Sequence, residues 1–268
     1  MQDQELEFYT DGIFSGNRRV IAKTITLVES TLPSDRNLAS RIIERIIPYS
    51  GKSVRFGITG VPGVGKSTFI ENLGLYLAGR GHRVAVLAVD PTSRRSGGSI
   101  LGDKTRMEKL AVHEHTFIRP SPAGDTLGGV AAKTREIMLI CEAAGYDVVM
   151  VETVGVGQSE TRVSTMVDFF LALLIAGAGD ELQGIKRGIL EVADAVAINK
   201  ADGDNRERAE RARKEYETAL HLVMPSSRSW TPPVLTCSSV TEGGTANVWR
   251  TVEDHRRIMN ETGEFGQR

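Results

Sequence analysis

Residues 60–67 read Gly-Val-Pro-Gly-Val-Gly-Lys-Ser, and their types and spacing are those of a loop that binds the phosphates of a nucleotide. Glycines let backbone N–H groups turn toward phosphate oxygens, and the positive end of the following helix favours the same anion. The Lys66 ammonium is expected to reach the β- and γ-phosphates, and the Ser67 hydroxyl to bind Mg²⁺. A strand is predicted before this loop and a helix after it, which disfavours a purely structural glycine turn.

We expect the whole loop to contact the nucleotide, together with the residue that follows it. These contact residues are Gly60, Val61, Pro62, Gly63, Val64, Gly65, Lys66, Ser67 and Thr68.

A second group of polar residues, Asn199-Lys200-Ala201-Asp202, follows a predicted strand far downstream of the phosphate loop. A carboxylate at position 202 can accept from both N1–H and the exocyclic amino group of guanine, and adenine would leave it unpaired. Asn199 is expected to fix the base and its loop, while the stem of Lys200 covers a face of the ring. The sequence therefore predicts a guanine site, with a polar turn as the alternative.

The segment after the last predicted strand is a candidate for reading the carbonyl oxygen of guanine. Ser238, Ser239 and Val240 could offer backbone N–H groups to it. A plain turn explains this segment almost as well.

Acidic residues at strand ends are candidates for the magnesium site. Asp90 and Glu152 both close predicted strands, where a carboxylate can orient a Mg²⁺-bound water. Glu152 and Gly155 resemble the D-x-x-G element of GTPases with Glu in place of Asp, so Gly155 is expected to contact the γ-phosphate and act as a hinge. Asp103 lies in a Gly- and Ser-rich loop suited to a switch, or is a solvated carboxylate. Gln158 could orient the attacking water or serve structure alone.

Continuous apolar runs alternate with helical stretches, as in a doubly wound, mostly parallel sheet whose faces are covered by helices. Such sheets bind ligands beyond the carboxyl ends of their strands, where the residues above lie. The predicted strands are residues 54–59, 84–89, 116–118, 147–151, 169–176, 195–199 and 234–237, and the predicted helices between them are 67–80, 127–144 and 206–222. Helices are also expected at 17–29, 37–47 and 246–260, with residues 32–35 as a connector.

We therefore expect three parts. Residues 1–50 form an N-terminal helical extension, residues 51–243 a P-loop GTPase domain, and residues 244–268 a C-terminal helix.

Composition narrows the function classes. The 268 residues carry 33 Lys and Arg against 34 Asp and Glu, and a formal net charge of -1 gives no electrostatic case for nucleic acid or a membrane surface. The longest apolar run, residues 169–176, is too short to span a bilayer. The polar, acidic N-terminus predicts no leader peptide, and two separated cysteines, Cys141 and Cys237, indicate buried thiols in a reducing compartment. We expect a cytoplasmic protein.

Longer stretches carry a family likeness. The chain resembles the MeaB/ArgK/MMAA family of P-loop GTPases, the chaperones of adenosylcobalamin-dependent acyl-CoA mutases. The matching stretches are residues 57–73 (GITGVPGVGKSTFIENL), 89–107 (VDPTSRRSGGSILGDKTRM), 119–134 (RPSPAGDTLGGVAAKT), 151–163 (VETVGVGQSETRV) and 176–188 (AGAGDELQGIKRG).

The resemblance implies a GTP-hydrolysing switch that gates cofactor loading into methylmalonyl-CoA mutase, or a relative of it, and protects that enzyme. It places Ser67, Asp90, Asp103 and Glu152 around Mg²⁺. It also makes residues 177–188 a switch loop toward the mutase, with Asp180 and Lys186 as the coupling candidates. By the same resemblance, residues 244–268 would be the start of a C-terminal dimerisation arm, so homodimer formation stays open for this chain.

Two other functions compete with this one. A small-molecule kinase could use the same phosphate loop, but the sequence offers no independent acceptor site and a kinase needs no guanine reader. A nickel or cobalt metallochaperone would be expected to carry a Cys- or His-rich metal motif, whereas the histidines are scattered and His113-Glu114-His115 is better explained as a solvated turn.

Overall fold

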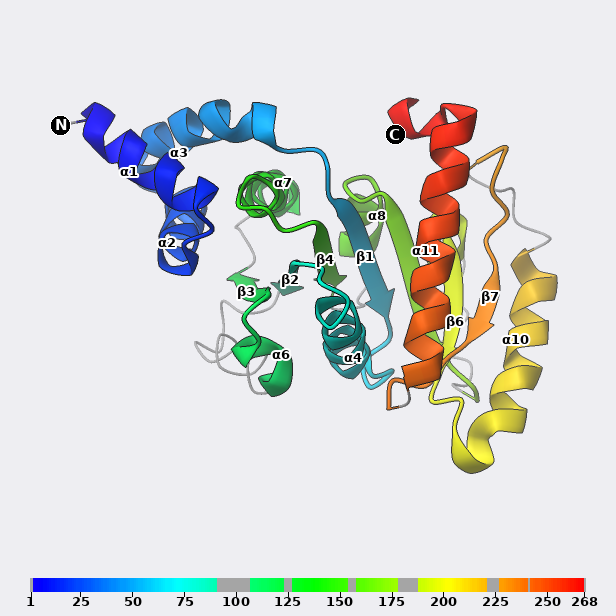
Figure 1. The fold of residues 1–268 in the computed structure, drawn as a ribbon. Helices are drawn as coiled ribbons and strands as arrows, with labels where there is room; N and C mark the ends of the chain where they lie inside the picture. Colours follow the sequence, from blue (N-terminus) through cyan, green and yellow to red (C-terminus); the bar gives the residue numbers. More distant parts are fainter. Residues whose placement is uncertain are drawn as a thin grey trace.

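A parallel sheet lies at the centre of the molecule (Figure 1). The computed structural model describes residues 2–90, 107–122, 127–153, 158–177, 188–220, 227–240 and 242–267. Within these residues the sheet has seven strands in the order β3-β2-β4-β1-β5-β6-β7, and every neighbouring pair is parallel. The strands are β1 (Val54–Gly60), β2 (Val84–Asp90), β3 (Thr116–Pro122), β4 (Val148–Thr153), β5 (Phe169–Ile175), β6 (Ala195–Asn199) and β7 (Val234–Thr236). The predicted doubly wound architecture is confirmed.

Helices cover both faces of the sheet, which is why most of its strands contain continuous apolar runs. Phe56 and Ile58 of β1 pack with α4 (Lys66–Ala78), α6 (Glu108–Val112) and α11 (Glu242–Thr262) on one face. Figure 1 shows α4 and α11 side by side on that face. Alternate residues of β2 and β4 turn to the other face, toward α7 (Leu127–Ala143) and α8 (Gln158–Ser164).

The N-terminal helices form a layer outside α7 (Figure 1). Here α2 (Arg18–Glu29) is capped by Asn17, whose side chain accepts from the Arg19 amide at 3.1 Å, and α3 (Pro33–Ile46) is followed by η1 (Ile47–Tyr49). The prediction that residues 32–35 connect two helices was wrong, because α3 begins at Pro33. Proline suits the first turn of a helix, where its missing N–H removes no hydrogen bond within the helix. Helix α1 (Gln2–Phe14) was not predicted.

Glu29 connects this layer to the sheet. Its carboxylate pairs with Arg119 of β3, and its carbonyl oxygen accepts from Lys133 Nζ on α7 at 2.6 Å. Arg119 also donates to Thr26 Oγ1 at 3.3 Å. Helix α2 therefore holds the strand and the helix that flank residues 123–126.

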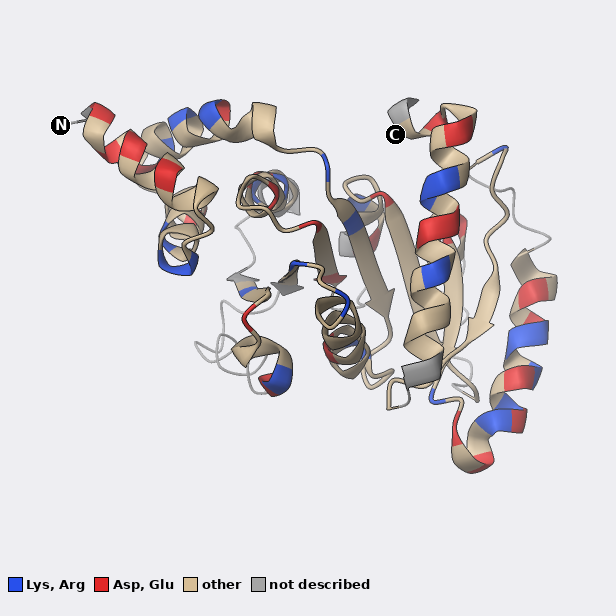
Figure 2. Cartoon of the chain, in the orientation of Figure 1, with Lys and Arg blue, Asp and Glu red and all other residues tan. Residues whose placement is uncertain are grey.

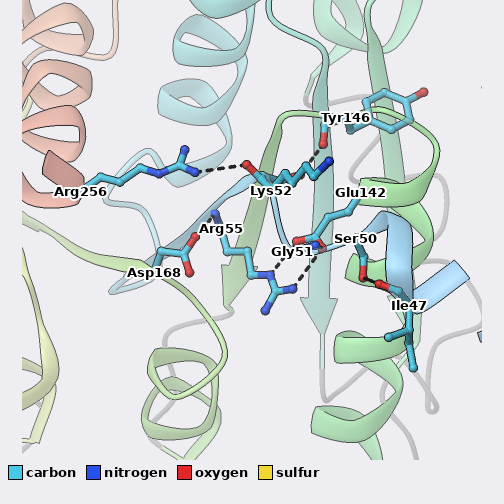
Figure 3. A network of polar contacts seen from close by, with 10 residues as sticks. Ile47, Ser50, Gly51, Lys52, Arg55, Glu142, Tyr146, Asp168 and Arg256 are labelled. Atoms are coloured by element: carbon cyan, nitrogen blue, oxygen red, sulfur yellow. Dashed lines mark hydrogen bonds and ion pairs between the residues drawn. The ribbon is translucent and has the colours of Figure 1, made fainter. Parts of the chain in front are cut away.

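A polar network closes the amino edge of the sheet, opposite the phosphate loop (Figure 3). Arg55 makes a bidentate pair with the buried carboxylate of Glu142, at 2.6 and 3.1 Å, and this raises the pKa of Arg55. The Asp168 carboxylate accepts from the Arg55 amide at 2.8 Å, and burial raises the pKa of Asp168. Glu142 also accepts from the amide of Gly51 at 2.6 Å. The network joins the start of β1 to α7 and to the segment before β5.

Helix α10 (Arg206–Leu220), which follows η3 (Gly203–Asn205), packs on β6 and β7 at the far side of the sheet. Its outward face alternates acidic and basic residues (Figure 2). The described chain ends in η4 (Glu264–Gln267) beside α11.

Both cysteines are buried as predicted; burial raises the pKa of Cys141 and lifts that of Cys237 to about 12. Among the described helices, none is both long and apolar enough to cross a membrane.

Candidate nucleotide site

The phosphate loop connects β1 to α4 at the centre of the sheet's carboxyl edge. Gly60, Gly63 and Gly65 have φ values of 152°, 79° and 96°, a region that favours glycine. A Cβ on Gly60 would lie 2.4 Å from the carbonyl oxygen of Leu173 on β5, so only glycine fits there. These residues turn the backbone back over the first turn of α4, whose N-terminus attracts anions.

Pro62 lies at the exposed tip of this loop and differs from its neighbours in what it can offer a phosphate. The Val64 amide donates to the carbonyl oxygen of Val61 at 3.2 Å, which closes a turn with Pro62 and Gly63 at its centre. Proline followed by a glycine of φ 79° is the pairing that a type II turn favours. Because proline has no backbone N–H, Pro62 shapes the turn and cannot donate to a phosphate oxygen. Any contact between Pro62 and the nucleotide therefore excludes a hydrogen bond from its backbone nitrogen.

The Lys66 side chain curls back over the loop that precedes it. Its Nζ donates to the carbonyl oxygens of Gly60 and Val61 at 2.7 and 3.3 Å. This arrangement places the ammonium beside the loop's concave backbone, where a phosphate oxygen would replace a carbonyl as its partner.

Ser67 and Glu152 bring two oxygen ligands together. The Ser67 hydroxyl, on the first turn of α4, donates to Glu152 Oε1 at 3.2 Å. Glu152 is only 9% exposed and lies on β4, directly beside β1. Next to it, Thr153 Oγ1 donates to Thr59 Oγ1 at 2.8 Å, which ties the ends of the two strands together. A hydroxyl and a buried carboxylate are hard oxygen donors of the kind that Mg²⁺ prefers, so the residues present fit that ion.

The second motif lies two strands away, after β6, and is bonded to the phosphate loop. The fully buried Asn199 donates through Nδ2 to the carbonyl oxygen of Val64 at 2.8 Å. Lys200 Nζ donates to the carbonyl oxygen of Gly63 at 2.9 Å. Lys200 has a φ of 59°, and among the described non-glycine residues it alone has a positive φ. A left-handed residue costs about 1–3 kcal/mol, and such strain collects at functional sites.

The loop after β7 reaches the same motif. Ser238 Oγ donates to Asp202 Oδ2 at 2.5 Å, and Ser239 donates from its amide and its hydroxyl to Asn199 Oδ1 at 3.0 and 2.9 Å. The Val240 amide donates to Ser238 Oγ at 3.3 Å. The structure thus brings residues 60–67, 199–202 and 238–240 to one edge of the sheet, as their positions after predicted strands led us to expect.

Several predicted site residues lie outside the part of the chain that the structure describes. Asp103, Gly155, Asp180 and Lys186 lie outside the described residues. β2 ends at Asp90 and α8 begins at Gln158, but the side chains of these two residues are likewise outside the description. Their roles remain predictions.

Sequence reasoning missed three residues that shape this edge. Asn72 of α4 donates to the carbonyl oxygen of Ser239, and Asn205 of η3 donates to that of Lys200 at 2.8 Å. Gly244 of α11 packs against residues 237–238 so closely that a Cβ would clash. None of the three belongs to a nucleotide-binding motif, and nothing in the sequence distinguishes Asn72 from the other polar residues of α4.

Comparison with known proteins decides the family. The model of "Methylmalonyl Co-A mutase-associated GTPase MeaB" matches residues 21–268. The chain belongs to the MeaB family. It is 54% identical over 266 residues to a probable GTPase of Mycobacterium tuberculosis, covering 99% of this chain and 79% of that one. It is 52% identical over 252 residues to the GTPase ArgK of Escherichia coli, covering 94% and 76%.

More distant relatives and solved structures extend the comparison. A mouse protein named methylmalonic aciduria type A homolog, mitochondrial, is 46% identical over 279 residues, covering 99% of this chain and 67% of that one. The crystal structure of an LAO/AO transport system kinase superposes with a TM-score of 0.85 at 42% identity, covering 100% and 80%. Nickel-bound HypB of Helicobacter pylori has a TM-score of 0.57 at 18% identity, covering 81% and 93%, which shows a shared fold alone. This MeaB-family protein is a P-loop GTPase that binds guanine nucleotides.

Proposed function

We propose that this GTPase is a Mg²⁺-dependent switch that acts on an adenosylcobalamin-dependent acyl-CoA mutase, gating the loading of the mutase's cofactor and protecting the enzyme. The family description names association with methylmalonyl-CoA mutase, and the mouse relative carries the name of methylmalonic aciduria. The observation that carries the nucleotide part is the bond between Asn199 and the carbonyl oxygen of Val64, because it makes one site of two distant motifs.

Different residues of this site bind different parts of the nucleotide. Residues 60–68, apart from Pro62, hold the phosphates with backbone N–H groups and the helix end, and Lys66 neutralises charge that develops between the β- and γ-phosphates. Asp202 accepts from guanine, Lys200 covers the ring, and N–H groups of residues 238–240 face the carbonyl oxygen of the base. Catalysis in such a site is mainly positioning and electrostatics.

The proposed magnesium site is built on Ser67 and Glu152, with Asp90 and Asp103 completing it. When bound, the ion neutralises negative charge on the β- and γ-phosphate oxygens. Glu152 lies in a buried position at the end of β4 that would otherwise disfavour a carboxylate's charge, and a cation there offsets that cost.

The switch segments complete the proposal. Gly155 would lose its contact with the γ-phosphate on hydrolysis, and Gln158 would orient the attacking water. Asp180 and Lys186, within residues 177–188, would transmit the change to the mutase. A homodimer is also part of the proposal, and sedimentation of the nucleotide-bound protein tests it.

A small-molecule kinase is the second candidate, because the structural relative at 42% identity is named a kinase. Such an enzyme would transfer the γ-phosphate to an acceptor rather than to water. The guanine-reading motif, with its fully buried Asn199 and half-buried Asp202, favours a switch, since phosphoryl transfer to a small molecule needs no such selectivity for the base.

The experiment is GTP hydrolysis by the full chain, with ATP as control, in the presence and absence of methylmalonyl-CoA mutase. Isolated switch GTPases turn over at about 10⁻⁴ to 10⁻² s⁻¹, and partners raise this by about 10³ to 10⁵. GTP-selective turnover that rises with the mutase supports the proposal. Equal rates with and without mutase point to another client, and a preference for ATP would overturn the base site and favour the kinase.

A further inference from the structure

Asn72 connects the helix after the phosphate loop to the loop after β7. It lies on α4, six residues beyond Lys66, and its Nδ2 donates to the carbonyl oxygen of Ser239. The same nitrogen donates to the carbonyl oxygen of Thr68, one turn earlier, at 3.1 Å. An asparagine amide nitrogen carries two hydrogens, so both bonds form together. Because both partners are carbonyl acceptors, the nitrogen and not the oxygen must face them.

All three polar groups of Ser239 are therefore held. Its amide and hydroxyl donate to Asn199 Oδ1 at 3.0 and 2.9 Å, and its carbonyl oxygen accepts from Asn72. Asn199 in turn donates to the carbonyl oxygen of Val64 in the phosphate loop at 2.8 Å. Since Val64 and Asn72 belong to the same loop-helix unit, these bonds close a ring between the phosphate loop and the loop after β7.

Helix α11 packs closely against the same loop. A Cβ on Gly244 would lie 2.6 Å from the amide nitrogen of Ser238 and 3.0 Å from Cα of Cys237. The loop therefore has no room to move toward α11. Asn199 anchors the loop to β6, and Asn72 anchors it to α4.

We propose that Asn72 is a positioning residue for the guanine base. It keeps residues 238–240 at a fixed distance from the phosphate loop, so that their N–H groups meet the base carbonyl oxygen while the phosphates are seated. The inference rests on the nucleotide site proposed above. Asn72 is remote in sequence from the base-reading residues, and its loss is expected to speed release of the nucleotide without changing the hydrolysis step.

The test compares Asn72→Ala and Asn72→Asp with the unmodified full chain. Displacement of fluorescent GDP by excess GDP, followed by stopped flow, gives the dissociation rate. Loss of one neutral hydrogen bond predicts a rate about 3- to 10-fold higher for Asn72→Ala. Asn72→Asp is expected to be faster still, because a carboxylate of the same shape faces the Ser239 carbonyl oxygen and cannot donate. The rate of single-turnover hydrolysis at saturating GTP should change by less than about 2-fold. The ratio of kcat for GTP to kcat for ATP should also change by less than about 2-fold.

Asn260 provides a matched control, because its Nδ2 donates to the carbonyl oxygen of Arg256 within α11 at 2.9 Å and it lies on the exposed side of that helix. Asn260→Ala should leave GDP dissociation unchanged. The proposal is overturned if Asn72→Ala releases GDP at the unmodified rate, or if it lowers kcat and the nucleotide-free melting temperature along with affinity, as a purely structural residue would. An unmodified chain that fails to bind GDP would instead overturn the proposed function.

Discussion

Ser238 Oγ donates to Asp202 Oδ2 at 2.5 Å, so the carboxylate expected to read guanine is oriented by the loop on the opposite side of the base site. This bond leaves Oδ1, and the second lone pair of Oδ2, for the base. Asp202 is half-buried, which adds to the energetic difference between a paired and an unpaired carboxylate.

Asp202→Asn should exchange guanine for xanthine preference, because the amide can donate to the 2-oxo group of xanthine and no longer accepts from N1–H and the amino group. Leaving such groups unpaired predicts a loss of GDP affinity of about 10- to 100-fold. Calorimetric titration with GDP and with xanthosine diphosphate measures both sides of the exchange. Ser238→Ala is the matched control, with a smaller loss and no gain for xanthine. Unchanged GDP affinity in Asp202→Asn would rule out the base-site assignment.

Ser67→Ala and Glu152→Gln should each reduce Mg²⁺-dependent hydrolysis by about 10²- to 10³-fold, the usual cost of removing one electrostatic contact to a transition state. Both substitutions nearly keep the size of the side chain and remove an oxygen ligand or its charge. Hydrolysis is measured while Mg²⁺ is raised from micromolar to millimolar. GDP binding in excess EDTA should be the same in both variants and the unmodified protein. Identical magnesium titrations for all three would show that these residues hold no cation.

Gly60→Ala should lower the melting temperature by about 4–10 °C. The new Cβ would lie 2.4 Å from the carbonyl oxygen of Leu173, in addition to the cost of a φ of 152°. Gly81→Ala is the control, since its φ is also positive at 89° but nothing lies within 4 Å of the added Cβ. Thermal unfolding of the nucleotide-free chain separates the clash from the backbone strain. Equal losses in the two variants would mean that contact with β5 is unimportant.

Asp168→Asn should stabilise the protein increasingly as the pH rises. Burial raises the pKa of Asp168, so the folded protein holds this proton more tightly than the unfolded chain. The protonated carboxyl therefore contributes stability below its unfolded pKa of about 3.9, and that contribution is lost as the pH rises through the folded pKa. Asparagine still accepts from the Arg55 amide and does not titrate. Urea unfolding of both proteins between pH 4 and 7 should show a growing difference in favour of the variant, and a difference that shrinks with pH would contradict this sign.

Most of the fold was predictable because the strands are buried on both faces and therefore read as continuous apolar runs. The run at residues 195–199 matches β6 at both ends. Prediction failed at α1, which has a weak apolar stripe and is held by packing on α2: a Cβ on Gly12 would lie 2.4 Å from Val20 Cγ1. Such close contacts between helices have no signature along the chain.

The site was predictable where function demands a fixed motif and not where geometry alone decides. Lys66, Asn199 and Asp202 could be named from the sequence because phosphate and guanine chemistry limits the residue types at a known spacing. Asn72 and Gly244 were missed, because their roles depend on how α4 and α11 approach the loop after β7. The positive φ of Lys200 was equally invisible, since a lysine carries no preference for that conformation.

Strand β7 is three residues long and lies at the edge of the sheet, yet its end carries the loop that we propose faces the base. Its pairing with β6 continues through the Cys237 amide, which donates to Ile198, and the Ala201 amide, which donates to Cys237, both at 2.9 Å. Short edge pairings open more often than central ones, and a bound ligand suppresses such openings. The amide protons of Cys237 and Ala201 should therefore exchange with deuterium quickly in the nucleotide-free protein and slowly with GDP bound. A partner that promotes nucleotide exchange would need only to weaken the pairing of β7 with β6.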